Sequence, residues 1–247
     1  MKKRSKIKIV VWVIVAALSI SLLTAAGLLY FGVVHLNNPS KKDYPVRGVD
    51  LSSYQGSVDW NTLSAQNIRF AFIKATEGSS FVDPRFKDNW SAAAGTGLRI
   101  GAYHFFSFES SGEKQAKLFC DTVSSVNNML PPVIDVEFYG KFHSEKDIDV
   151  AEVKKELRTL VDILTDEYNM KPIIYANGST YKTIVRGDFD DCDLWFRSVY
   201  SGVPSDISWT FWQYSNRHVL KGYEGKERYI DMNVFAGDVN AFEHYPN

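Results

Sequence analysis

The 247-residue chain has little cysteine and no excess of charge of either sign. Its two cysteines, Cys120 and Cys192, are too few for a disulfide framework and lack metal-ligand spacing, so we expect the fold to depend on its hydrophobic core. The two would be able to pair outside the cell, but nothing in the sequence brings them together. The 28 basic residues are balanced by 29 acidic ones, which excludes a nucleic-acid binder that works through a basic surface.

The motifs of several cofactor and nucleophile families are also missing. The chain has no phosphate-binding loop and no Ser-His-Asp or zinc pattern, and segment 95–101 (GTGLRIG) lacks the spacing of a dinucleotide site. His104 has no second histidine at metal-ligand spacing, so we predict a hydrogen-bonded histidine in the core or wall of the fold. We expect neither a cofactor nor a metal ion.

The N-terminus contains a long uncharged run behind a basic tail. Residues 1–8 carry five cations, and residues 9–34 carry no charge. As a helix, that run would extend about 39 Å, enough to cross a hydrocarbon layer of about 30 Å. It is longer than the apolar part of a cleaved signal peptide, although residues 24–26 (TAA) resemble a cleavage site. We predict a single-pass transmembrane anchor at 9–34 with a cytoplasmic tail at 1–8, and a cleaved signal is the alternative.

The remaining sequence is predicted to form a linker at 35–47 and one domain at 48–245. Removing the five N-terminal cations from the 28 basic residues leaves 23 against 29 acidic residues, so the exported part carries a formal charge of −6. This charge argues against attachment to an anionic wall or membrane surface by bulk electrostatics. We expect the domain to lie outside the cell as a monomer.

Short β-rich segments recur along this domain and alternate at first with amphipathic stretches. Segment 148–168, for example, spaces its apolar residues three and four positions apart, which is a helical period. Such alternation predicts parallel βα units. The later gaps are too short for helical crossovers, which favours an α/β fold of the TIM-like (β/α)5β3 barrel type; an open sheet is the alternative. The eight segments are 46–52, 70–76, 100–108, 131–138, 171–177, 194–200, 209–215 and 228–235.

Polar residues interrupt these apolar segments near their C-terminal ends, which is the end of a parallel barrel that carries active sites. Burial of a carboxylate in such a segment is unfavourable unless the group is paired or functional, so four acids at these positions indicate a site. The acids are Asp50, Asp135, Glu137 and Asp231.

Asp135 and Glu137 are the sharpest local feature. Residues i and i+2 of a strand point to the same face, so the two carboxylates project together. Two like charges in one site raise one pKa, and a carboxyl that keeps its proton can act as a general acid. The alternative is an exposed strand end with two solvated acids. The apolar neighbours of the pair, and the acids on other strands, favour catalysis.

Seven segments, in order, resemble the glycoside hydrolase family 25 lysozymes, the Chalaropsis-type N-acetylmuramidases. The resemblance implies a (β/α)5β3 barrel that hydrolyses the β-1,4 bond between N-acetylmuramic acid and N-acetylglucosamine in peptidoglycan glycan strands. The segments are GVDLSSYQGSVDW (48–60), FIKATEG (72–78), GAYHFFSF (101–108), PPVIDVE (131–137), IIYAN (173–177), FWQYS (211–215) and IDMNVF (230–235).

Carried over by position, the resemblance makes Glu137 the general acid. Asp135 would stabilise positive charge near the anomeric carbon or orient the substrate acetamido group, and Asp50 and Asp231 would complete an acidic floor. The resemblance favours a substrate-assisted route, a recognised exception to the two-carboxylate scheme. A non-catalytic glycan-binding module on the same barrel is the alternative, but a binder gains nothing from several desolvated carboxylates.

Other polar and aromatic residues are candidates for substrate binding. Tyr103, Tyr175 and Trp212 have rings that would stack on sugar faces, and the alternative for each is a place in the barrel core. Gln213 and Lys74 are further candidates, although we expect Lys74 more as an internal partner of the acids than as a substrate ligand.

Overall fold

The computed structural model describes residues 2–246 and divides the chain into two compact units, one up to Leu36 and one from Asn37 onward. The first unit contains α1 (Lys2–Tyr30), of which residues 6–30 are long and apolar enough to cross a membrane. A signal sequence near an N-terminus passes the same test of length and composition. The helix fits an anchor or a signal equally, and it ends at Tyr30, four residues before the predicted end of the anchor at 34.

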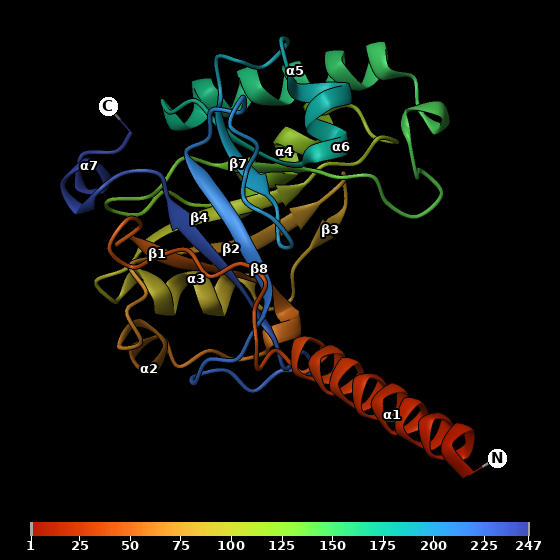
Figure 1. Ribbon diagram of the computed structural model, residues 1–247. Helices are drawn as coiled ribbons and strands as arrows, with labels where there is room; N and C mark the ends of the chain where they lie inside the picture. The colour runs from red at the N-terminus through yellow and green to blue at the C-terminus, as the bar shows by residue number, and fades with distance from the viewer. Residues whose placement is uncertain (1, 247) are drawn as a thin grey trace. The chain divides into compact units, whose positions relative to one another are not determined.

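The second unit is a closed eight-stranded barrel (Figure 1), which confirms the predicted fold over the open sheet. β3 (Phe81–Val82) is an additional short strand that forms an antiparallel hairpin with β2 (Phe70–Glu77). From β2 the order around the barrel is β1 (Arg47–Leu51), β9 (Ile230–Phe235), β8 (Phe211–His218), β7 (Asp193–Arg197), β6 (Ile173–Asn177), β5 (Val133–Val136) and β4 (Arg99–Phe105), which pairs with β2 again.

The connections explain the direction of the strands. Every neighbouring pair from β1 through β2, β4, β5, β6 and β7 to β8 is parallel, and helices cover the first five crossovers. Residues 198–210 and 219–229 contain no helix, and β9 runs antiparallel to both β8 and β1. The helices of the domain are α2 (Trp60–Ser64), α3 (Phe86–Ala94), α4 (Gly112–Thr122), α5 (Val150–Tyr168), α6 (Gly178–Thr180) with a π-helical turn at Tyr181–Val185, and α7 (Val239–Glu243).

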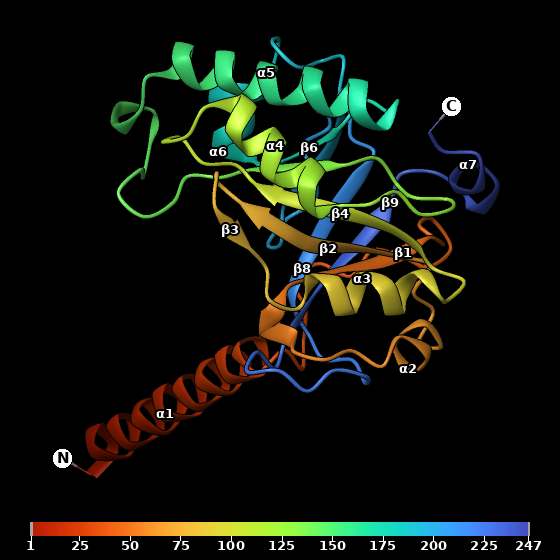
Figure 2. The same cartoon turned by 180° about the vertical axis from the view of Figure 1, so that it is seen from behind.

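Helix α5 shows how local sequence places these covering elements. The side chain of Asp149 accepts hydrogen bonds from the backbone N–H groups of Ala151 and Glu152 and so caps the helix N-terminus. Asn169, in a left-handed conformation, ends it. The apolar stripe of α5 is buried, and the two views show α4, α5 and α6 on one side of the barrel and α2 and α3 on the other (Figure 2).

Alternate residues of the strands pack into two hydrophobic layers, one inside the barrel and one under the helices. The inner layer is largely aromatic. The ring of Phe72 lies 4.5 Å from that of Trp195, and the ring of Tyr175 lies 4.6 Å from Trp195. These rings fill the interior, so the polar residues at the C-terminal ends of the strands stand on a packed floor rather than over a pore.

The structure also shows where the predicted linker and the two cysteines lie. Residues 37–46, within the predicted linker, contact the domain: the side-chain amide of Asn37 donates to the backbone carbonyls of Ser198 (2.9 Å) and Ser201 (2.8 Å). Cys120, on α4, and Cys192, next to β7, are both free thiols, so no disulfide joins them.

Candidate active site

The four predicted acids meet at one end of the barrel, where the parallel strands end and the antiparallel strand β9 begins with Asp231 near its start. Asp50 on β1 lies directly opposite Asp231 on β9, and the two side chains share a hydrogen bond. Asp135 lies on β5, and Glu137 is the first residue after that strand. The charges of the two carboxylates repel one another. Asp135 also interacts electrostatically with Asp50, and Asp231 with Glu137, so the structure joins two pairs into one acid cluster.

One half of the acid cluster, Asp50 and Asp231, is held by side-chain amides. The amide nitrogen of Gln213 donates to Oδ2 of Asp50 (2.9 Å) and to Oδ2 of Asp231 (3.1 Å), and that of Asn233 donates to the same oxygen of Asp50 (2.8 Å). The Tyr175 hydroxyl donates to the carbonyl oxygen of Gln213 (3.0 Å), which fixes the direction of that amide. In the same way, the indole N–H of Trp195 donates to Asn233 (2.8 Å). Buried tyrosine and tryptophan thus orient the amides that bind the acids.

The other half, Asp135 and Glu137, is less completely bonded. Asn177, the last residue of β6, donates to Oε1 of Glu137 at 3.2 Å. Oδ1 of Asp135 is buried and has no hydrogen-bond partner among the described residues. A buried carboxylate oxygen without a partner is rare, because its desolvation is not compensated. Residues 2–246 of the protein thus leave one acceptor of the acid cluster without a hydrogen bond.

Burial controls the protonation of the acid cluster. Desolvation raises the pKa of Asp50 to about 6, with the bonds from Asn233 and Gln213 opposing the rise. Desolvation and the neighbouring Glu137 raise the pKa of Asp135 well above its usual range. Desolvation and Asp50 do the same to Asp231. Since these groups interact, Asp50, Asp135 and Asp231 lose their protons in coupled steps, at higher pH than solvated carboxyls do.

Lys74 was predicted as an internal partner of the four acids, but its ion pair is with Glu77, outside that set. Its ammonium group lies 2.7 Å from a carboxylate oxygen of Glu77 and near the rings of Phe81 (5.5 Å) and Phe105 (5.2 Å). Its charge lowers the pKa of Asp135 against the larger effect of burial. Lys74 therefore acts on the acid cluster from the side of β2.

The three aromatic candidates for sugar binding do not all lie on the same face of the barrel wall. Tyr103 on β4 packs against the inner layer and faces Asp50 and Asp135. The burial of Tyr103 raises the pKa of its hydroxyl, and the charges of the two acids raise it further. Tyr175 also points inward, but it is only 4% exposed and uses its hydroxyl on Gln213, so it supports the site rather than offering a ring face to a sugar. Trp212 lies on the opposite face of β8, packs in the outer layer and donates to the backbone carbonyl of Ser198 (2.9 Å).

Besides Tyr175, the structure also corrects Trp212 as a substrate-binding candidate. Trp212 precedes Gln213 in the same strand, and successive strand residues point to opposite faces. Because Gln213 binds the acids from inside the barrel, the indole of Trp212 must point away from the barrel interior. It packs in the hydrophobic layer under the helices, so Trp212 is a core residue, which was the alternative interpretation.

His104 is confirmed as a hydrogen-bonded core residue. It is fully buried on the outer face of β4, where Nδ1 contacts the Thr76 hydroxyl (2.7 Å) and Nε2 contacts the side-chain oxygen of Gln115 (3.0 Å). That oxygen accepts hydrogen bonds only, so Nε2 carries the proton and Nδ1 accepts from Thr76. Burial lowers the pKa of His104 to about 4, which keeps the ring neutral.

Sequence reasoning missed three residues of this site. Asn177 donates to Glu137, and Trp195 orients the Asn233 amide that binds Asp50. Arg197 is a half-buried cation on β7 near the same acids. The signal was present in the period of β7, since Trp195 and Arg197 are two positions apart and share a face. Only the closed sheet shows that this face is the one with the acids.

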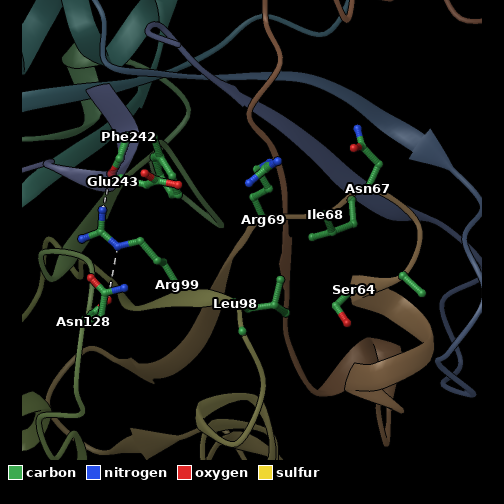
Figure 3. Close-up of a pocket in the computed structure, with 11 residues that line it drawn as sticks. Ser64, Asn67, Ile68, Arg69, Leu98, Arg99, Asn128, Phe242 and Glu243 are labelled. Carbon is green, nitrogen blue, oxygen red and sulfur yellow. Dashed lines mark hydrogen bonds between the residues drawn. The ribbon is translucent and has the colours of Figure 1, made fainter. Parts of the chain in front are cut away.

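The opposite end of the barrel has a hollow but none of the four acids. It measures about 730 Å³ and lies where β2 and β4 begin, close to α7. Arg99 crosses it and donates to the backbone carbonyls of Phe242 (2.5 Å) and Asn128 (3.3 Å), as Figure 3 shows. These bonds tie α7 and the segment before β5 to the barrel, which is a structural role at the end of a barrel where stability rather than catalysis is expected.

Comparisons with known proteins identify the family and the fold of the chain. The sequence profile described as "Glycosyl hydrolases family 25" matches residues 49–223. The chain is 47% identical to a family 25 glycosyl hydrolase from Bacillus anthracis, with a TM-score of 0.79 over 87% of this chain and 98% of that structure. It is 30% identical to the bacterial lysozyme from Streptomyces coelicolor, with a TM-score of 0.72 over 80% of this chain and 95% of that structure. "Lysozyme M1" of Streptomyces globisporus is 32% identical and is matched over 78% of this chain and 68% of its own length.

Proposed function

The chain belongs to glycosyl hydrolases family 25, and on that premise we propose that it is a peptidoglycan hydrolase, a 1,4-β-N-acetylmuramidase. Two relatives that carry the name lysozyme support the activity. The observation that carries the proposal is the pair Asp135 and Glu137 at the C-terminal end of the barrel, with one buried oxygen of Asp135 left without a protein partner.

The proposed roles follow from the two halves of the acid cluster. Glu137 donates a proton to the glycosidic oxygen as the bond from that oxygen to the anomeric carbon breaks. Asp135, through its unpartnered oxygen, orients the substrate acetamido group, whose oxygen attacks the anomeric carbon, and stabilises the positive charge that develops there. Asp50 and Asp231, locked by Gln213, form the floor against which this pair acts.

Tyr103 is proposed to contact the substrate, and two further residues are proposed to support the acids. Tyr103 faces the acids and remains partly exposed, so its ring and hydroxyl are available to a sugar. Lys74 and Gln213 support the acids rather than the glycan, because their polar groups are already engaged by Glu77 and by Asp50 and Asp231.

We further propose that α1 anchors the protein in the cell membrane as a single pass, with the barrel outside. The uncharged run of residues 9–34 behind five cations supports this orientation, because basic residues remain on the cytoplasmic side. An extracellular barrel also places the enzyme in the compartment of its proposed substrate.

The decisive experiment is mass analysis of the fragments released from defined peptidoglycan by the full chain. A muramidase leaves N-acetylmuramic acid at the new reducing ends. N-acetylglucosamine at those ends would assign cleavage of the other glycosidic bond. Binding of glycan strands with no fragments would instead identify a non-catalytic module. Clearing of a turbid cell-wall suspension gives a rapid first readout of the same activity.

A further inference from the structure

Arg197 occupies a particular place in the sheet. The register pairs it with Asn177 on β6 and with Gln213 on β8. Paired residues of neighbouring strands point to the same face, so the Arg197 side chain stands between these two amides on the inner side of the barrel.

Each of those amides holds a different half of the acid cluster. Asn177 donates to Glu137 at 3.2 Å, whereas Gln213 donates to Asp50 at 2.9 Å and to Asp231 at 3.1 Å. The cation is therefore on the strand that separates the two halves. No other position of the barrel is in register with both amides.

Arg197 is not neutralised by any one of these acids. Among residues 2–246 it forms no ion pair, whereas the other cation near the acid cluster, Lys74, is paired with Glu77 at 2.7 Å. Burial lowers the pKa of Arg197, but the attraction of Tyr175, Glu137 and Asp231 outweighs this and raises it. The guanidinium thus stays charged and acts on both halves at a distance.

The charge of Arg197 changes the pKa of three of the acids in the same direction. Desolvation raises the pKa of Asp50, Asp135 and Asp231, and the charge of Arg197 opposes the rise in all three. A close ion pair would concentrate the effect on one carboxylate, because the Coulomb energy falls with distance. A cation that lies between the two halves, without an ion pair to either, instead lowers the pKa of carboxylates in both.

We propose that Arg197 is a positioning residue of the acid cluster: its charge, placed between the two amide-held halves, allows one carboxylate in each half to be ionised at the same time. The role rests on the proposed function, in which an ionised carboxylate stabilises positive charge on the sugar while a neighbouring carboxyl supplies the proton. Without the cation, ionisation of one half would suppress ionisation of the other.

Several titratable groups interact with Arg197 or with the acids near it, and they contribute to any pH profile. On β8, the register partner of Arg197 is the neutral Gln213. The groups that interact with Arg197 are Asp50 on β1, Asp135 on β5 with Glu137 after it, Tyr175 on β6, Asp231 on β9 and Tyr200 after β7. Tyr103 on β4 and Lys74 on β2 interact with Asp135, and Glu77 on β2 pairs with Lys74.

The first test measures kcat/KM on soluble peptidoglycan against pH for the full chain. Arg197→Gln removes the charge, Arg197→Lys keeps it, and Arg69→Gln is a matched control at the opposite end of the barrel. Loss of the cation makes the carboxylates harder to ionise, so the acidic limb of the Arg197→Gln profile moves to higher pH by about one unit. Arg197→Lys and Arg69→Gln leave that limb in place. An equal loss of activity at every pH in both Arg197 variants would indicate a purely structural role and overturn the proposal.

A second measurement does not depend on activity. The ionised acid cluster is less favourable without Arg197, so Arg197→Gln should unfold about 3–5 °C below wild type near pH 7.5. Near pH 4, where the raised pKa values keep Asp50, Asp135 and Asp231 protonated, it should unfold at the wild-type temperature. If the wild type releases no fragments yet this difference is present, the proposed function fails and the role of Arg197 in the cluster stands. If the difference is the same at both pH values, the inference fails whatever the activity.

Discussion

Asp50→Asn is expected to stabilise the protein at neutral pH while it removes activity. Burial raises the pKa of Asp50 from 3.8 to about 6, a shift of about two units, and each unit corresponds to about 1.4 kcal/mol. Ionised Asp50 therefore costs the folded state about 3 kcal/mol above neutrality. The asparagine keeps the local bonds, because its carbonyl oxygen accepts from Gln213 and Asn233 and its amide nitrogen faces Asp231.

The sign of the pH dependence is fixed by linkage. The folded state binds the Asp50 proton more tightly than the unfolded chain does, so wild-type stability falls as the pH rises from about 4 to about 6. Asp50→Asn does not titrate at this position. The two proteins should therefore be equally stable near pH 4 and differ by about 3 kcal/mol near pH 7.5, which corresponds to about 6–12 °C in unfolding temperature for a domain of this size.

The assay is thermal unfolding of the full chain in mild detergent, followed by near-ultraviolet circular dichroism, at about pH 4, 5.5 and 7.5. Asp166→Asn, an exposed carboxylate on α5, is the matched control and should show no pH-dependent difference from wild type. Destabilisation by Asp50→Asn near pH 7.5, or a stabilisation of the same size at all three pH values, would refute the account of the acid cluster as buried and undercompensated.

Three further predictions concern catalysis, packing and location. Glu137→Gln should lower kcat by about 10²–10⁴-fold on peptidoglycan without lowering the unfolding temperature, since the amide still accepts from Asn177 but has no proton to give; more than about a tenth of wild-type activity would exclude Glu137 as the acid. Gly112→Ala should cost about 1–3 kcal/mol in urea unfolding, because its Cβ would lie 2.1 Å from the Glu156 carbonyl oxygen, whereas Gly97→Ala, with no atom within 4 Å, should cost much less; equal costs would contradict the close approach of α4 and α5. Membrane fractionation should find the full-length chain in membranes with its barrel open to external protease, and a shortened soluble product would show signal cleavage instead.

The sequence was sufficient to predict which residues share a face within one strand. The period of two places Asp135 and Glu137 together, and the position of polar residues at the ends of apolar segments indicates which end of the barrel carries the site. The five helical crossovers were also predictable, because a parallel crossover usually contains a helix. These features depend only on the spacing of residues along the chain, which can be read from the sequence without the tertiary structure. The short later connections did not reveal that β7 and β8 are parallel without a helix in residues 198–210 between them, whereas β9 is antiparallel to β8.

The faces of individual aromatic residues required the structure. The period of two shows that Trp212 and Gln213 point in opposite directions, but not which of them points inward. The bonds from Gln213 to Asp50 and Asp231 settle that question and place Trp212 in the outer layer.

Only the closed barrel decided how the acids are held and where Arg197 lies among them. Asp50 and the amide of Gln213 are 163 residues apart in the chain, and Asn177 and Glu137 are 40 apart. Contacts of this kind depend on the register between strands and on the pairing of β1 with both β2 and β9. Register is set by the packing of the whole sheet and its core, so no local pattern of residues encodes it.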